Sequence, residues 1–352
     1  MGLKVAVPDM GKRDMIDHNS DGTRRSRDVV IVGGGIIGLS IAWQLARRSR
    51  LSITLMDKGA APGEGSTGAS SAVCRHRYSR DEVLQLAKDG IAAYRHWQAF
   101  TGLATPRAEF HRDGVLWMPG DDGSWAVREQ ERMASHAVAA LALDDRELAE
   151  RFPAFSDCTR APDVETGELH QCRGGSRHLL ELDGGWVDPV LAAEDLREAC
   201  LAAGVEVRYG ACVTDLETTG GRVSGVMVNE GEQVAAGHVI NAAGPWCNTL
   251  LGMAGLPLRW ELVPTRIQVL YLDRPAAVAG HIPVSVDMQG GVYFRTQNRG
   301  QQLVVGSVLE EDEREAVADP DAFDRQPDEG FRQRTLHRLH HRLPALPYRG
   351  PV

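Results

Sequence analysis

The sequence lacks any hydrophobic run of the roughly 20 residues that a membrane-spanning helix needs, and no signal-peptide core stands near its N-terminus. It also lacks closely spaced cysteine pairs. The six cysteines are scattered with no CxxC pair, which favours reduced thiols in a cytoplasmic protein over a disulfide framework or a zinc site. An excess of basic charge is missing too, because the net charge is −9. We therefore expect no transmembrane segment, no metal site and no nucleic acid as a partner.

What is present fits an ordinary globular protein. The chain has 352 residues, of which 43% are hydrophobic and 25% charged. This length suggests about two domains with a substantial core. Residues 1–27 mix charges of both signs with few apolar side chains, so we predict a flexible leader there.

A glycine-rich turn follows the leader. Four β-branched residues, Val29 to Val32, predict a strand buried on both faces of a parallel sheet. The run then breaks into Gly33-x-Gly35-x-x-Gly38 and continues with helical apolar spacing. In the dinucleotide fold the first glycine makes the tight turn, the second admits a pyrophosphate, and the third lets the helix lie close to the strand.

A second β run, Leu51 to Met56, ends in Asp57, about 20 residues beyond the last glycine, as the dinucleotide fold requires. A carboxylate there accepts hydrogen bonds from ribose hydroxyls and repels a 2′-phosphate, so FAD or NAD is favoured over NADP. The alternative is a strand, turn and helix that bind no ligand.

The remaining chain contains both predicted helices and predicted antiparallel strands. Amphipathic spacing predicts a helix over 191–203 that ends at Gly204. Three runs, 267–272, 292–295 and 303–308, predict antiparallel strands. A basic helix over 331–343 and the acidic run 310–313 are expected to be solvated. The histidines of that helix share one face, but its arginines oppose a bound cation.

Four segments together resemble the FAD-dependent amino-acid and amine oxidoreductases of the D-amino-acid oxidase superfamily, most closely sarcosine oxidase and dimethylglycine dehydrogenase. The resemblance covers nearly the whole chain. It rests on residues 29–40 with Asp57, on 65–78, on Trp186-Val187-Asp188-Pro189, and on Ile240 to Trp246.

The resemblance implies an α/β plus α+β fold, in which a Rossmann-like FAD-binding domain is joined to a second, antiparallel-sheet substrate domain. The FAD-binding domain would comprise residues 28–88 and 176–252, and the substrate domain 89–175 and 253–345. Residues 346–352 would begin a C-terminal FAD-domain segment that family members continue and that is truncated here.

The family also implies which residues contact FAD. The diphosphate would lie on the glycine turn, the ribose on Asp57, and the adenine edge on the backbone of Val213. Small and hydroxyl-bearing residues would line the diphosphate, ribityl chain and flavin ring. The predicted cofactor residues are Gly33, Gly35, Ile36, Ile37, Gly38, Asp57, Lys58, Ser66, Thr67, Gly68, Ser70, Ser71, Val213, Ala242, Ala243, Gly244 and Trp246.

In sarcosine-oxidase-like enzymes an arginine at the position of Arg75 clamps the substrate carboxylate, which a planar guanidinium can hold bidentately. A surface arginine is the alternative. His76 would orient substrate or flavin, or serve only the structure.

The implied enzyme oxidises a small amine or amino acid by hydride transfer to flavin N5, giving an imine that hydrolyses. No lysine stands in 301–306, where oxidases of this kind place one over the flavin. The electron acceptor is therefore O₂ or a carrier protein or quinone. A non-catalytic flavin-binding subunit and an NAD-dependent dehydrogenase are the alternatives. The sequence does not fix the oligomeric state.

Overall fold

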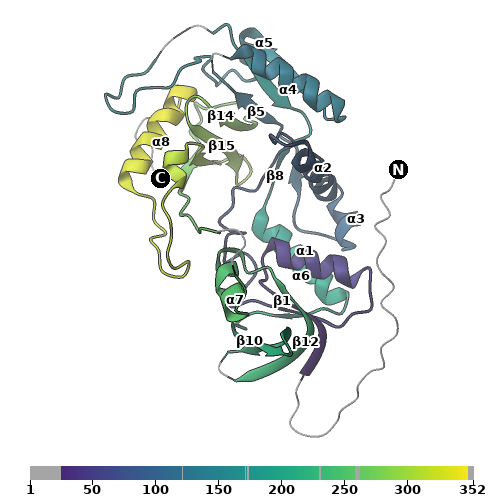
Figure 1. Cartoon of the computed structure of the whole chain (residues 1–352). Coiled ribbons are helices and arrows are strands. Elements are labelled where there is room, and N and C mark those ends of the chain that lie inside the picture. The colour runs from purple at the N-terminus through teal and green to yellow at the C-terminus, as the bar shows by residue number, and fades with distance from the viewer. Residues whose placement is uncertain are drawn as a thin grey trace.

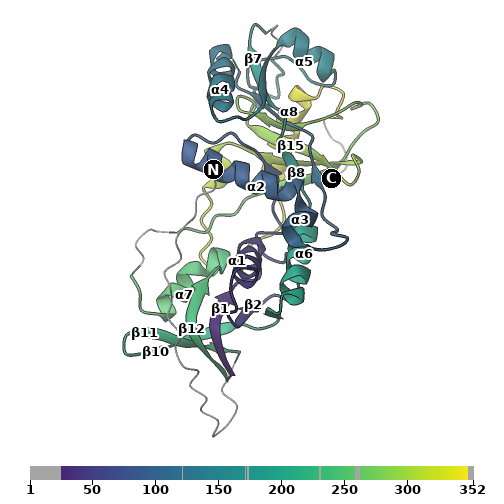
Figure 2. The same cartoon turned by 90° about the vertical axis from the view of Figure 1, so that its right-hand side faces the viewer.

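A computed structural model describes residues 25–347 apart from 121, 171, 173, 230 and 258–261. The chain forms two lobes, each built around its own β-sheet (Figure 1). A six-stranded sheet forms one lobe and a seven-stranded sheet the other. A small three-stranded sheet lies at their junction, as the perpendicular view in Figure 2 also shows. No helix in the described ranges combines the length and apolarity needed to cross a membrane.

The helices are distributed over both lobes. In chain order they are α1 (Ile36–Ala46), α2 (Asp81–Arg95), α3 (Trp97–Thr101), α4 (Gly123–Ser135), α5 (Asp145–Arg151), α6 (Pro189–Ala202), α7 (Cys247–Met253) and α8 (Glu329–Arg342), with 3-10 turns η1 (Gly244–Trp246) and η2 (Glu310–Glu313).

The six-stranded sheet contains the glycine turn. Its strands are β1 (Arg25–Val32), β2 (Ile53–Met56), β9 (Glu206–Arg208), β10 (Val213–Thr219), β11 (Arg222–Val228) and β12 (Glu232–Asn241). They lie in the order β10-β11-β12-β1-β2-β9, and β1 runs parallel to both β12 and β2. The predicted parallel sheet around the first strand is therefore confirmed.

The strand β1 is buried on both faces. Val29 and Ile31 pack in one cluster with residues of α1 and α6, whereas Val30 and Val32 pack in another with residues of β10, β11 and α7. This alternation is what a run of β-branched residues in a central strand predicts, and it is confirmed. The strand β1 begins earlier than expected, because Arg25 to Arg27 already pair with β12. The prediction of a flexible leader is therefore wrong for these three residues, and the rest of the predicted leader, 1–24, lies outside the described ranges.

The helix α6 (Pro189–Ala202) begins two residues before the predicted start at 191 and ends one residue before the predicted end at 203. Asp188 caps its N-terminus, because Oδ1 accepts hydrogen bonds from the amides of Val190 at 3.0 Å and Leu191 at 2.9 Å. Gly204, just past its last turn, has a φ of +83°.

The seven-stranded sheet combines strands from distant parts of the chain. They are β5 (Val115–Met118), β6 (Ala140–Asp144), β7 (Arg177–Glu181), β13 (Val269–Asp273), β14 (Val284–Asp287), β15 (Val292–Gln297) and β16 (Gln302–Ser307). Their order is β13-β16-β15-β14-β5-β7-β6, and only the pair of β14 with β5 is parallel among these strands. The predicted boundary at residue 176 is wrong for β7, because β7 pairs with β5 and β6. The assignment of the two lobes to FAD and substrate stays a prediction.

The three strands at the junction are short. They are β3 (Val73–Cys74), β4 (Phe110–His111) and β8 (Gly185–Val187), with β8 in the middle.

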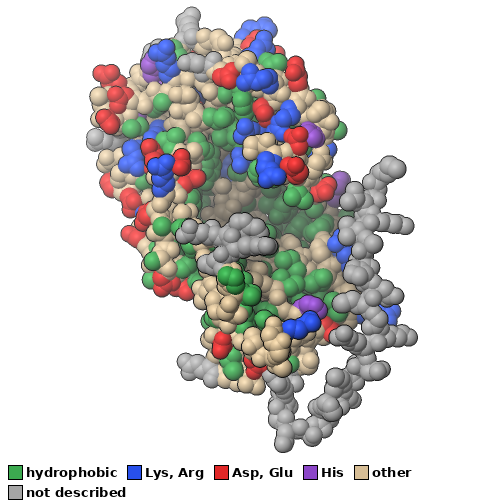
Figure 3. Space-filling view, in the orientation of Figure 1, with side chains coloured by type: hydrophobic (Ala, Val, Ile, Leu, Met, Phe, Trp, Pro, Cys, Tyr) green, Lys and Arg blue, Asp and Glu red, His purple; other side chains and the backbone are tan. Residues whose placement is uncertain are grey.

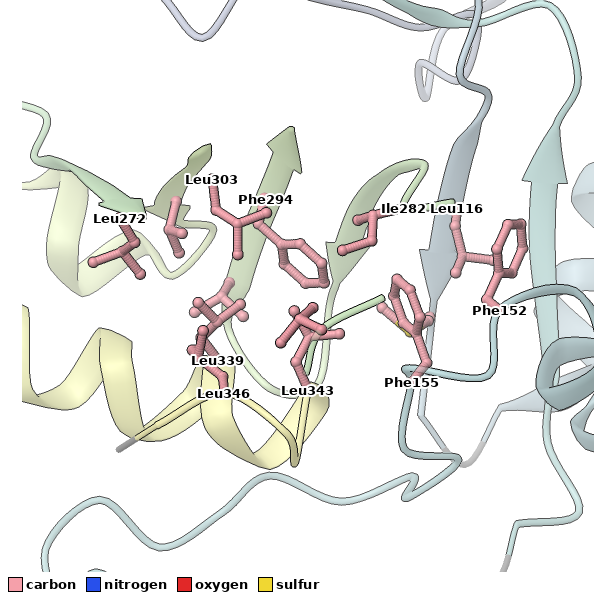
Figure 4. Close-up of a cluster of buried hydrophobic side chains, with 14 of the residues drawn as sticks. Leu116, Phe152, Phe155, Leu272, Ile282, Phe294, Leu303, Leu339, Leu343 and Leu346 are labelled. Atoms are coloured by element: carbon pink, nitrogen blue, oxygen red, sulfur yellow. The ribbon is translucent and has the colours of Figure 1, made fainter. Parts of the chain in front are cut away.

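The helix α8 covers one face of the seven-stranded sheet (Figure 4). Leu339 and Leu343 of α8, with Leu346 beyond it, point toward Phe294 and Leu303 of the sheet, and all five are buried. The expectation of a solvated helix is therefore wrong, because one side of α8 completes the apolar core.

Two arginines of α8 are buried and form ion pairs with buried acidic residues. Arg342 is 1% exposed and its Nε lies 2.8 Å from Oδ2 of Asp287, which is fully buried. Arg338 Nη1 lies 3.2 Å from Oδ2 of Asp312, and both side chains are largely buried. The acidic run 310–313 was also expected to be solvated, and for Asp312 this is wrong. Pairing with opposite charge is what makes this burial tolerable.

The burial of this pair leads to a stability prediction. We expect Arg342→Met to lower the free energy of unfolding by about 3–5 kcal/mol, because it leaves the Asp287 carboxylate buried without a counter-charge. The matched control is Arg332→Met on the same helix, whose 2.9 Å pair with Glu329 lies at the surface. It should cost less than about 1 kcal/mol. Urea denaturation measures both, and equal losses would contradict the assignment.

Candidate active site

Close backbone packing holds the glycine turn after β1. Gly33 has a φ of +112°, in the region that favours glycine. A β-carbon on Gly33 would lie 2.1 Å from the carbonyl oxygen of Ala242, and one on Gly38 would lie 1.8 Å from that of Gly33. The tight turn at Gly33 and the close helix packing at Gly38 are therefore confirmed.

The first turn of α1 keeps two backbone donors free. The amide of Ile36 donates to Thr67 Oγ1 at 3.0 Å, and the amide of Leu39 donates to a carbonyl of the turn. Between them, the amides of Ile37 and Gly38 have no acceptor in the part of the chain that the structure describes. Free N–H groups at the positive end of the helix dipole form a site that suits an anion such as a diphosphate.

Asp57 follows β2 and its carboxylate is fixed by two backbone amides. Oδ2 accepts from Gly34 N at 2.6 Å, and Oδ1 accepts from Gly59 N at 2.7 Å. The backbone of Asp57 is fixed as well, because its carbonyl accepts from Ala211 N at 2.9 Å. Each carboxylate oxygen retains another lone pair, so this side chain can accept hydrogen bonds from a ribose without changing its orientation.

The segment after β2 folds into consecutive turns beside α1. A β-carbon on Gly35 would lie 2.9 Å from Thr67 Oγ1, and one on Gly68 would lie 2.0 Å from a carbonyl oxygen of the preceding turn. Ser66 and Ser70 are exposed. The structure thus brings this predicted cofactor segment against the glycine turn.

The ends of β10 and β12 contribute the next predicted residues. Val213 begins β10 and is buried. Ala242 N donates to Val32 O at 2.8 Å, which ties the end of β12 to the end of β1. Ala243 follows, and Gly244, with a φ of +54°, opens the turn η1.

Lys58 and Trp246 meet at a residue that sequence reasoning missed. Lys58 Nζ lies 2.5 Å from Asp321 Oδ2 and 3.9 Å from the centroid of the Trp246 ring. Trp246 Nε1 donates to the same oxygen at 3.0 Å. The hydrogen bond from Lys58 lowers the pKa of Asp321 from its ordinary value. No motif surrounds Asp321, so the sequence held no signal for this contact.

A cavity of about 300 Å³ opens beside the cofactor segment. Gly68 and Ser70 of that segment line it together with Trp186, Tyr271 and Arg295. The face shown in Figure 3 is hollowed between the two lobes, and hydrophobic side chains gather on the walls of the hollow.

Arg295 on β15 is the buried cation of this cavity, and sequence reasoning missed it. Only 3% of the residue is exposed, and its guanidinium carbon lies 4.1 Å from the centroid of the Trp186 ring. Nε donates to the carbonyl of Ser71 at 2.6 Å and Nη1 to that of Thr296 at 2.9 Å. No carboxylate of the described chain pairs with it. Burial lowers its pKa from the ordinary arginine value. An arginine directly after the apolar and aromatic residues 292–294 was the one signal available.

Arg75 lies between two aromatic rings. Its guanidinium carbon is 4.8 Å from the centroid of Tyr78 and 5.1 Å from that of Trp117. Arg75 is half-buried, and among the described residues no carboxylate forms an ion pair with it.

His76 belongs to a buried network around Glu181. Its Nδ1 lies 3.2 Å from Glu181 Oε2, and its backbone amide donates to the same oxygen at 2.6 Å. Trp117 Nε1 and the amide of Arg77 donate to Oε1 at 2.7 and 3.2 Å. Glu181 is fully buried, and no motif around it singles it out in the sequence. A catalytic role for His76 stays a prediction.

Comparison with curated proteins gives relatives of one kind. The chain is 26% identical over 91% of its length to FAD-dependent oxidoreductase domain-containing protein 1 of Xenopus laevis, of which it covers 67%. It is 26% identical over 81% of its length to glycine oxidase of Pseudomonas putida, covering 72% of that protein. It is 23% identical over 78% of its length to mitochondrial dimethylglycine dehydrogenase of Homo sapiens, but spans 30% of that protein.

Solved structures share the fold. L-proline dehydrogenase from P. horikoshii superposes with a TM-score of 0.75 at 19% identity, covering 92% of this chain and 79% of that one. Glycine oxidase from Geobacillus kaustophilus gives 0.70 at 21% identity, covering 91% and 79%. The predicted α/β plus α+β fold is therefore confirmed.

The model of the family described as FAD dependent oxidoreductase, DAO, matches residues 28–352. The match spans the glycine turn, Asp57 and the strands of both large sheets, and this chain therefore belongs to the DAO family of FAD-dependent oxidoreductases.

Proposed function

We propose that this protein oxidises a small amine that carries a carboxylate, such as glycine, an N-methylated glycine or another amino acid, with FAD bound at the glycine turn. The observation that carries the proposal is the pair of free amides at Ile37 and Gly38 beside the oriented carboxylate of Asp57. Together they offer donors to a diphosphate and acceptors to a ribose, which are the two polar parts that FAD presents to a dinucleotide fold.

The remaining predicted residues fit an extended cofactor. Val213 would meet the adenine edge, while 66–68, with Ser70 and Ser71, would follow the diphosphate, the ribityl chain and the flavin. Ala242 to Gly244 would form the second small-residue contact. Lys58 and Trp246 would act as a unit with Asp321 rather than as separate contacts, because these three side chains are already joined.

The chemistry of oxidation belongs to the cofactor. Bound FAD would accept a hydride at N5 from the carbon next to the substrate nitrogen, leaving an imine that water hydrolyses. The protein would hold the substrate and exclude water. A substrate amine that binds in its neutral form needs no dedicated general base.

Arg295 is the residue best placed to bind the substrate carboxylate. It lines the cavity beside Ser70, its Nε is held by the carbonyl of Ser71, and its charge has no carboxylate partner among the described residues. Planar guanidinium groups bind carboxylates bidentately, and burial strengthens that interaction. Arg75 remains the alternative anchor. The rings of Tyr78 and Trp117 flank its guanidinium, which supports a packing role.

The identity of the electron acceptor is inferred from residues 301–306. No lysine stands within 301–306 of the sequence, where the resemblance to oxidases expects one. A carrier protein or a quinone is therefore as plausible an electron acceptor as O₂.

The six cysteines are free thiols in the structure, which supports a reducing compartment such as the cytoplasm.

The proposal predicts a yellow protein whose colour responds to substrate. Purified protein should show flavin absorbance, and anaerobic addition of sarcosine, glycine, proline or a D-amino acid should bleach it with at least one of these compounds. A flavin that none of them bleaches would favour the non-catalytic flavin-binding alternative. Colourless protein that FAD does not protect against heating would overturn the cofactor assignment.

Asp57→Ala tests the ribose contact. Loss of hydrogen bonds to a charged acceptor costs about 1.5–3 kcal/mol, so FAD affinity should fall about 10- to 100-fold. The matched control is Asp28→Ala, whose carboxylate instead accepts from the amide of Ser52 at 2.7 Å, near the start of β2. Titration of apoprotein with FAD measures both variants. Unchanged affinity in Asp57→Ala would contradict the assignment.

The two arginines can be separated by matched variants. We expect Arg295→Gln to lower the second-order rate constant for anaerobic flavin reduction by the substrate about 10- to 100-fold. The reason is that one charge-assisted contact to the substrate carboxylate is lost. Arg75→Gln should change this rate constant less than Arg295→Gln does. With an amine that lacks a carboxylate, Arg295→Gln should have little effect. The reverse order of the two variants would assign the carboxylate to Arg75.

A further inference from the structure

Two thiols and an imidazole converge on the segment between α5 and β7, outside the proposed cofactor and substrate residues. Cys158 Sγ lies 3.3 Å from Cys172 Sγ and 3.5 Å from His170 Nδ1. All three donor atoms lie within 4.8 Å of one another. Cys158 is 2% exposed, whereas His170 and Cys172 are half-buried. The two cysteines form no recognisable metal motif in the sequence, because 13 residues separate them.

The spacing of these atoms suits a tetrahedral metal ion. Zinc binds thiolate sulfur at about 2.3 Å and imidazole nitrogen at about 2.0–2.1 Å, so neighbouring ligand atoms around it lie roughly 3.5–3.8 Å apart. The observed separations from Cys158 are close to this range, and small shifts would complete it. Sulfur and nitrogen are also the donor types that zinc prefers in proteins.

Thr159 contacts one of the two thiols through both of its polar groups. Its backbone amide nitrogen lies 3.4 Å from Cys172 Sγ, and its hydroxyl oxygen lies 3.5 Å from the same sulfur. Zinc binds cysteine as a thiolate, and hydrogen-bond donors beside the sulfur are the usual support of a ligating thiolate.

The helix α8 fixes both ends of the cluster. His341 Nε2 lies 2.8 Å from the carbonyl oxygen of His170, and Arg342 Nη2 donates to the carbonyl of Cys158 at 3.0 Å. These contacts hold the backbone at Cys158 and at His170 against α8. They leave the side chains of Cys158, His170 and Cys172 directed toward one another.

A disulfide between Cys158 and Cys172 is the competing interpretation. A disulfide would give the ring of His170 no role, although its Nδ1 is as near to Cys158 Sγ as a zinc ligand would be. The imidazole is therefore the observation that favours a metal. We propose that Cys158, His170 and Cys172 bind one zinc ion with water as the fourth ligand, and that this ion joins the two ends of the segment between α5 and β7 that α8 already contacts.

Cobalt(II) provides the test because its tetrahedral thiolate complexes absorb strongly. Cobalt added anaerobically to the reduced, metal-free full chain should bind one equivalent. Difference spectra against the same sample, which cancel any flavin, should show thiolate-to-cobalt charge transfer and tetrahedral d–d bands. One equivalent of zinc should displace the cobalt and abolish them.

Three variants complete the experiment. Cys172→Ser and His170→Ala should each weaken cobalt binding at least tenfold, whereas Cys212→Ser, which removes a half-buried thiol elsewhere, should bind as the wild type does. Circular dichroism checks that each variant is folded. If Cys172→Ser does not fold, His170→Ala alone tests the site. No uptake by the reduced wild type, or equal uptake by all three variants, would overturn the proposal. So would a Cys158–Cys172 disulfide that re-forms in the presence of zinc.

Discussion

The rest of the lobe with the six-stranded sheet depends on one close backbone contact, where the glycine turn meets the end of β12. Neither Gly33 nor Gly38 can carry a side chain. A β-carbon on Gly33 would collide with Ala242, and one on Gly38 would collide with Gly33. This packing sets α1 directly above the turn. As a result, the free amides of Ile37 and Gly38 and the carboxylate of Asp57 all lie at the same end of β1 and β2.

Two contacts connect this lobe to the other one at the places where polar chemistry is needed. Arg295 of the seven-stranded sheet reaches the carbonyl of Ser71, and Asp321, just before α8, reaches Lys58. Both contacts place charged side chains of the second lobe against segments that we propose to contact FAD. The cavity that we propose for the substrate is lined by residues of both lobes. Such an arrangement would let the cofactor site stay constant while the substrate side varies.

Local rules in the sequence predicted the parts of the structure that local physics determines. The strand at Val29 to Val32, the glycine turn and the end of α6 before Gly204 all follow from residue preferences over a few positions. The missed residues depend on contacts between distant segments. Asp321 and Arg295 acquire their positions only when the lobes assemble, and the burial of α8 depends on acids such as Asp287 that lie far away in the chain. No alternation or motif in one segment records such pairings.

We propose that the turn and Asp57 recognise the adenosine diphosphate half of FAD. The most direct measurement compares FAD and FMN binding to the apoprotein by flavin fluorescence, with ADP as a competitor. Because FMN lacks the adenosine half, we expect FMN to bind at least about 100-fold more weakly than FAD, a difference of about 2.7 kcal/mol. We also expect ADP to displace FAD. Equal affinities for the two flavins, with no competition by ADP, would contradict this recognition of the adenosine diphosphate half.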